Sequence, residues 1–144
     1  MILWSAQESE LIGIGVESGL LKLVWSWRGE EPSTTVVVPR TVVADGTWHD
    51  VAVSITAANI TVVADQKATL VFNHHQDRLI ATDGIFYLGG FPKQRSVQNE
   101  TKAMFHSSFQ GCISELAWSE SIGITDFKNF QGENIASCDV HAES

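Results

Sequence analysis

Apolar and polar positions alternate along much of the chain, and this period of two is typical of β-strands. The clearest example begins at residue 21, where Leu21, Leu23, Trp25 and Trp27 occupy every second position. This spacing puts two leucines and two indoles on one face of a strand. We therefore expect the strand to contribute that face to a hydrophobic core, with Trp27 beside Trp25.

The same pattern predicts further strands, and turn-forming residues separate them. The continuous run Val36–Val38 predicts a strand that is buried on both faces. No window shows the apolar stripe of a helix, and the longest stretch without a strand pattern, from Phe91 to Ser108, is expected to be a functional or mobile loop. These features favour an all-β antiparallel sandwich or barrel. The other expected strands lie at residues 2–4, 12–16, 51–55, 60–64, 85–88 and 113–118.

Length and charge limit the classes of partner. The 144 residues correspond to one domain, and a hydrophobic share of 44% is enough for a core. The formal net charge is -8, so we expect neither nucleic acid nor an anionic membrane surface as a partner, because both require a cationic footprint. No apolar run approaches the ~20 residues that span a bilayer, and we expect no membrane insertion.

Two cysteines and two glycosylation motifs indicate the compartment. Cys112 and Cys138 form either one disulfide, which would contribute about 3–4 kcal/mol on the chain-entropy model, or a pair of reduced core thiols. Asn59 and Asn99 each begin an Asn-x-Thr acceptor triplet for N-glycosylation. Together these features favour an extracellular environment. Because the N-terminus does not resemble a signal peptide, we expect a domain excised from a longer secreted or cell-surface chain.

Catalytic arrangements are not evident. A glycosidase needs two carboxylates that face one sugar. Glu8 and Glu10 are the only such pair inside or beside an expected strand, Glu30 and Glu31 lie in an expected turn, and neither pair has an aromatic or acidic companion. The five histidines belong to no His-Glu-x-x-His motif, and the chain has no Gly-x-Ser-x-Gly motif. We therefore predict no catalytic residue and no enzymatic activity.

Two loops hold the residues that we expect to contact a partner. Lys93, Arg95 and Lys102 form either a small patch that binds heparin-like sulfated glycans weakly or a merely solvated loop. Trp27 and Arg28 begin the other loop, Trp27–Pro32, and both are residue types that are enriched at binding hot spots. For Trp27 two positions stay open, because the alternation places it on the core face with Trp25.

Three motifs, in this order, resemble those of one family. They are DGTWHDV at Asp45–Val51, YLGGFP at Tyr87–Pro92 and FQGCI at Phe109–Ile113, the last closed by Cys138. With this order and spacing, the chain resembles a laminin G-like domain, also called a laminin/neurexin/sex-hormone-binding-globulin domain.

The resemblance implies a jelly-roll β-sandwich of two curved antiparallel sheets, the concanavalin/laminin G-like architecture. It also implies a non-catalytic module of extracellular matrix or adhesion proteins that presents rim loops to a protein receptor or a glycan. Within this fold we expect Trp48 to open a strand with its ring inward and His49 to be a packing residue. We expect one such domain over residues 2–138, with or without its first strands, and a tail over residues 139–144.

The sequence departs from the family at the expected calcium site. Many members hold a calcium ion at the rim through two acidic or amide side chains and two backbone carbonyls, but Ser26 and Ser107 stand at the positions that match those side chains. Two hydroxyls do not replace the charges that offset calcium dehydration, so we predict no family-type calcium site and no other cofactor. Two alternatives stay open: a concanavalin-type lectin, which needs exposed aromatic side chains, and a carrier with an apolar cavity between its sheets.

Overall fold

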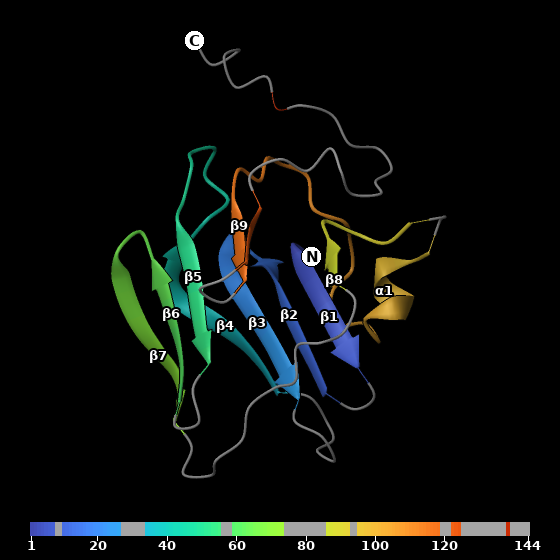
Figure 1. Cartoon of the computed structure of the whole chain (residues 1–144), viewed down its shortest axis with the longest axis horizontal. Helices are drawn as coiled ribbons and strands as arrows, with labels where there is room; N and C mark the ends of the chain where they lie inside the picture. The colour runs from blue at the N-terminus through green and yellow to red at the C-terminus, as the bar shows by residue number, and fades with distance from the viewer. Residues whose placement is uncertain are drawn as a thin grey trace.

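The computed structural model of the chain describes residues 1–7, 10–26, 34–55, 59–73, 86–92, 95–118, 122–124 and 138. Within these residues the chain forms ten strands and one short helix (Figure 1), and the predicted all-β class is confirmed. The elements are β1 (Leu3–Gln7), β2 (Glu10–Glu17), β3 (Leu20–Ser26), β4 (Thr34–Val42), β5 (Val51–Ile55), β6 (Asn59–Ala64), β7 (Lys67–Asn73), β8 (Phe86–Leu88), α1 (Val97–Glu100), β9 (Leu116–Trp118) and β10 (Ile122–Ile124).

A five-stranded antiparallel sheet with the order β4-β3-β2-β1-β8 forms one layer of the fold. β2 and β3 are joined by Ser18 and Gly19, which both have positive φ. A two-residue turn of this kind matches the right-handed twist of the flanking strands. Because side chains alternate across a strand, Leu23 and Trp25 of β3 face one side of the sheet and Val24 faces the other.

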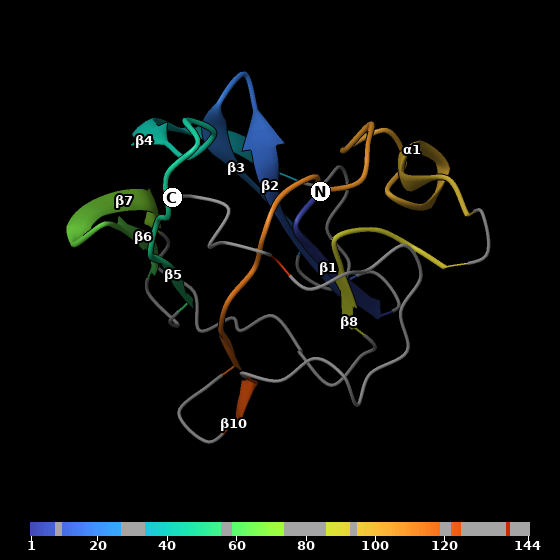
Figure 2. The same ribbon diagram turned by 90° about the horizontal axis from the view of Figure 1, so that it is seen from above.

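A three-stranded antiparallel sheet of β5, β6 and β7 lies against one face of the larger sheet (Figure 2). β6 is its central strand, and the side chains of Ile60 and Val62 on β6 are completely buried. They form one hydrophobic cluster with Leu21, Leu23 and Trp25 of β3. The alternation predicted for β3 is therefore confirmed as far as Trp25, and the core lies between two antiparallel sheets, as in the predicted sandwich.

The segment from Ser96 to Phe105, which contains α1, covers the opposite face of the five-stranded sheet (Figure 2). We call it the covering segment, or the cover. Phe105 of this segment is 3% exposed and packs edge-on against Trp4, with 6.2 Å between the ring centroids. Gly13 and Gly15 of β2 leave room for the ring, since a Cβ atom at Gly15 would lie 2.8 Å from Cδ1 of Phe105. Val24 is also fully buried on this face. Part of the stretch that was expected to be a loop is therefore a packed cover.

Lys22 is a buried cation beneath this cover. Its ammonium group donates to the carbonyl oxygen of Met104 at 2.5 Å and to Oε1 of Glu17 at 3.3 Å, and it lies 5.2 Å from the centroid of the Phe105 ring. A buried charge without partners is strongly unfavourable. These contacts therefore help to fix the path of the covering segment across the sheet.

The sequence prediction is wrong about the burial of β4, and it misses β7 and β10. Val36 and Val37 are only half-buried, because β4 lies at the end of the strand order and no other described strand pairs with its outer edge. β7 is missing from the sequence prediction, since Asp65 and Gln66 form the turn before it without a glycine. Both residues have positive φ, 50° and 71°, which is uncommon for residues other than glycine.

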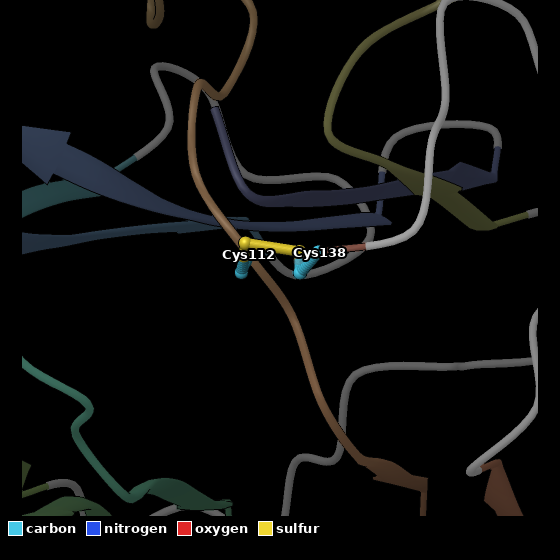
Figure 3. Close-up of a disulfide and its surroundings, with 2 residues drawn as sticks. All are labelled: Cys112 and Cys138. Atoms are coloured by element: carbon cyan, nitrogen blue, oxygen red, sulfur yellow. A yellow bond between two sulfur atoms is a disulfide. The ribbon is translucent and has the colours of Figure 1, made fainter. Parts of the chain in front are cut away.

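Cys112 and Cys138 form a disulfide, with 5.9 Å between their Cα atoms (Figure 3). This separation lies in the usual range for such a bridge. The bond connects the segment that leads into β9 with a residue 26 positions further along the chain. The choice between a disulfide and two reduced thiols, which the sequence left open, is thereby decided in favour of the disulfide.

Candidate binding surface

A cluster of hydrogen bonds connects the turn before β5 with the turn between β6 and β7. Nε2 of His49 lies 2.6 Å from Oδ1 of Asp45, and Nδ1 of His49 lies 2.6 Å from Oδ2 of Asp65. Asp65 also accepts the backbone N–H of Asp50 at 2.9 Å. We call Asp45, His49 and Asp65 the histidine clamp, because the imidazole ties the two turns together.

The clamp is complete only when both nitrogens of the imidazole carry hydrogen, since both face carboxylate oxygens. Hydrogen bonds to Asp65 and Asp45 raise the pKa of His49 above its ordinary value. In turn, hydrogen bonds from His49 and Thr47 lower the pKa of Asp45 to about 2, and the hydrogen bond from His49 lowers the pKa of Asp65. The side chain of His49 is 13% exposed. His49 therefore serves as a polar bridge, in contrast to the packing role that was expected of it.

Trp48 is 56% exposed, so the prediction that its ring faces the core is wrong. β5 begins only at Val51, which leaves Trp48 in the preceding turn. Hydrogen bonds between other residues hold this turn closed, so the indole of Trp48 is not needed to fix it. Oδ1 of Asp45 accepts the N–H and the hydroxyl of Thr47, at 3.1 and 2.7 Å, in addition to its contact with His49. The result is an exposed indole on a turn whose backbone is held by its neighbours.

Arg95 is engaged by side chains of its own chain. Its Nε and Nη2 donate to the two carboxylate oxygens of Glu100 at 2.9 and 2.8 Å, and its Nη1 donates to the hydroxyl of Tyr87 at 3.2 Å. The guanidinium carbon also lies 5.1 and 5.2 Å from the ring centroids of Tyr87 and Phe91. The pair with Glu100 raises the pKa of Arg95 and lowers that of Glu100. The charge of Arg95 is therefore largely compensated before any partner binds.

The other residues expected to contact a partner have different positions. Lys102 is exposed, two residues after the end of α1, with φ of 51°. Trp27, Arg28 and Lys93 lie outside the described residues. Arg95 and Lys102 are thus the two members of the expected patch that the structure places; Lys102 belongs to the covering segment, and Arg95 immediately precedes it.

The two serines at the expected calcium positions differ in exposure. Ser26 is buried at the end of β3, where it pairs with Leu11 of β2, whereas Ser107 is exposed. Across the described ranges, no group of three or more His, Cys, Asp or Glu side chains is arranged to hold a metal ion. No helix in the same part of the chain has the length and apolar character needed to cross a bilayer.

The two predicted glycosylation acceptors occupy different settings. Asn59 is half-buried at the start of the central strand β6, and Thr61 of its triplet is half-buried as well. Asn99 is exposed on α1, but Thr101 of its triplet is completely buried.

The histidine clamp is a feature that sequence reasoning missed. The spacing of Asp45 and His49, four residues apart within one motif, is a local signal for their contact. Asp65 is 16 positions from His49 and comes close only because β5 pairs with β6, with Val51 opposite Ala64. The sequence predicts both strands of that pair, but it does not predict β7 or the turn before β7 in which Asp65 lies.

Comparisons with known proteins agree with this architecture. The family model described as Laminin G domain matches residues 1–120. The protein named Protein eyes shut from Drosophila melanogaster is 31% identical over 169 aligned positions, which cover 99% of this chain and 8% of that protein. Laminin subunit alpha-1 from Homo sapiens is 31% identical over 101 positions, which cover 67% of this chain and 3% of that protein. The chain thus spans less than a tenth of the length of either relative.

Proposed function

Because the chain belongs to the laminin G domain family, we propose that it is a non-catalytic extracellular binding module of an adhesion or matrix protein. The family match over residues 1–120 carries this proposal. The similarity to laminin subunit alpha-1 supports it, as does the disulfide, a bond that persists in oxidising compartments. The module would act by presenting surface loops to a protein receptor or a glycan.

We propose that the turn carrying Trp48 is part of the partner-contacting surface. Tryptophan is among the residue types that dominate binding energy at interfaces. The clamp holds the turn before a partner arrives, so little conformational freedom is lost on binding. Val51, at the start of β5, is 40% exposed and provides a second apolar side chain close to Trp48 in sequence.

A concanavalin-type lectin is the second candidate function, and the exposure of Trp48 favours it. An exposed indole can stack on the apolar face of a sugar ring, and Trp48 provides one. Trp48 is next in sequence to His49 of the histidine clamp, which contains the carboxylates of Asp45 and Asp65. Because these carboxylates would repel a sulfate group, they favour a neutral sugar over a sulfated one. For heparin we propose only weak binding through Lys102, because Glu100 compensates the charge of Arg95 and the chain has a net charge of -8.

Binding by this module should not require the calcium site of the family. Ser26 and Ser107 supply no negative charge at the two positions that match the family's side-chain ligands. Calorimetric titration with calcium tests this proposal directly. A dissociation constant below about 10⁻⁴ M would contradict it.

The binding function is tested by titrating the domain with heparin and with neutral oligosaccharides, with and without calcium. Tryptophan fluorescence and calorimetry would follow the binding. Trp48→Ala should weaken the binding of a neutral ligand much more than the control Val42→Ala, which truncates an exposed apolar side chain on β4, whereas Lys102→Gln should weaken only the binding of heparin. Equal effects of Trp48→Ala and Val42→Ala would refute the placement of the surface at Trp48. Hydrolysis of any of these glycans would refute the non-catalytic function.

A further inference from the structure

The acceptor triplet at Asn99 has an exposed asparagine and an inaccessible threonine. Thr101 has 0% of its surface exposed. Its hydroxyl donates to the carbonyl oxygen of Val97 at 2.7 Å, with the carbonyl oxygen of Phe105 at 3.2 Å, and accepts the backbone N–H of Phe105 at 3.0 Å. The single hydroxyl hydrogen and the approach to the oxygen are therefore both taken up within the fold.

Enzymatic N-glycosylation needs the hydroxyl that the fold hides. The transferase recognises the Ser or Thr side chain two positions after the asparagine while the acceptor lies in its site. In the transfer, Nδ2 of Asn99 forms a bond to the anomeric carbon of a lipid-linked oligosaccharide. The bond from that carbon to the diphosphate breaks, the lipid diphosphate leaves with the electron pair, and the amide loses one proton. A folded triplet whose hydroxyl is buried cannot enter such a site.

We propose that Asn99 is N-glycosylated only before the segment from Ser96 to Phe105 folds over the five-stranded sheet, and that the finished domain is no longer an acceptor. The proposal rests on the proposed function in one respect, since an extracellular protein passes through the secretory pathway, where N-glycosylation takes place. It does not depend on any binding partner. Thr101 then has two successive roles. It is a recognition element on the unfolded chain, and it anchors the cover in the folded domain.

The folded domain has space for a glycan at this position. Asn99 is exposed on α1, which lies on the outside of the five-stranded sheet (Figure 1). Its backbone N–H and carbonyl groups bond to Ser96 and Lys102, and its side-chain amide makes no hydrogen bond with the other described residues. A glycan added early would therefore remain on the surface when Thr101 becomes buried.

The decisive experiment compares the folded and the unfolded chain as acceptors. Unglycosylated full-length protein, either native with its disulfide or reduced and unfolded, would be incubated with solubilised oligosaccharyltransferase and a lipid-linked oligosaccharide. Mass spectrometry after enzymatic release of the glycan would report the occupancy of Asn99. We expect a glycan at Asn99 in the unfolded chain and none at Asn99 in the native domain, and any product from Asn99→Gln should carry its glycan at Asn59.

A destabilised cover provides the second test. Phe105→Ala removes the ring that packs on the sheet but leaves the acceptor triplet unchanged, so it should restore transfer to Asn99 under native conditions. Thr101→Ser keeps the hydroxyl and its burial, and the native variant should remain a non-acceptor. Transfer to Asn99 in the native wild-type domain, or no transfer even to the unfolded chain, would overturn the proposal.

Failure of the proposed function would give a different result, namely no binding in the glycan titrations while the difference between folded and unfolded acceptors persists. Protein from secreting mammalian cells that has Asn99 empty, together with transfer to the unfolded chain in vitro, would instead overturn the early glycosylation of Asn99. Occupied Asn99 in secreted protein, together with a native domain that cannot be modified afterwards, is the outcome that supports both.

Discussion

Replacement of Gly15 by alanine should destabilise the domain, because the new methyl group would enter the space that Phe105 occupies. A Cβ atom at this position would lie 2.8 Å from Cδ1 and 3.2 Å from Cζ of the ring, whereas carbon atoms in favourable contact are about 3.5–4.0 Å apart. Overpacking of this kind costs about 1–3 kcal/mol. Alanine regains about 0.5–1 kcal/mol by restricting the unfolded backbone, so the net loss should be about 0–2.5 kcal/mol.

A double-mutant cycle isolates the cause. Phe105→Leu destabilises the domain on its own, but it removes the ring atoms that the Cβ at residue 15 would meet. In that background Gly15→Ala should become neutral or stabilising, which gives a coupling free energy of about 1–3 kcal/mol. Equilibrium unfolding in urea, with the disulfide intact and m-values compared among the four proteins, measures each term.

Gly13 provides the matched control. A Cβ atom there would meet Cε3 of Trp4 at 2.7 Å as well as Cε2 of Phe105 at 2.8 Å. Phe105→Leu should therefore relieve only part of the penalty of Gly13→Ala. If the effects of Gly15→Ala and Phe105→Leu add within about 0.5 kcal/mol, the ring does not lie over β2 as described, and the account of the covered face is wrong.

Three further outcomes can be checked by urea unfolding. The stability due to the histidine clamp should be fully present below the ordinary histidine pKa of 6.5 and lost as pH rises through the raised pKa of His49. The contributions of Asp45 and Asp65 should be present above their ordinary pKa of 3.8 and lost as pH falls through the lowered values. His49→Gln should abolish the alkaline loss, and an unchanged pH profile would contradict the clamp. Cys138→Ser should lower the free energy of unfolding by about 3–4 kcal/mol, and a loss below 1 kcal/mol would show that the bond closes no effective loop. Thr41→Val should cost about 1–3 kcal/mol, because the Thr41 hydroxyl accepts the buried N–H of Leu21, whereas Thr41→Ser should be nearly neutral; equal losses would assign the effect to packing instead.

The sequence predicts the sandwich well because its core follows a strict alternation. Leu21, Leu23 and Trp25 lie on one face of β3, and the structure buries all three. What alternation cannot reveal is whether the other face meets water. Val24 and Lys22 on that face are also buried, because a segment some 80 residues further along the chain returns to cover them, as the contact of Lys22 with Met104 shows (82 positions).

The binding surface was harder to predict because it depends on turns. Trp48 is part of the motif that identified the family, and a large apolar residue beside a strand is usually placed in the core. Its exposure follows from hydrogen bonds that close the turn around it, including the one between His49 and Asp65. Asp65 comes close through the pairing of β5 with β6, and it lies in the turn between β6 and β7, which contains no glycine, so neither composition nor periodicity indicates the contact.

The disulfide also determines how the domain would respond to mechanical tension. A pull applied beyond Cys138 is transmitted across the sulfur–sulfur bond to Cys112, so the chain between the two cysteines, whose sequence separation is 26, cannot lengthen. This part of the chain would measure about 90 Å when fully extended, and tension could extend it only after a reductant cleaves the bond. In the extracellular setting proposed above, reduction of this one bond would thus add that length to the chain that tension can extend.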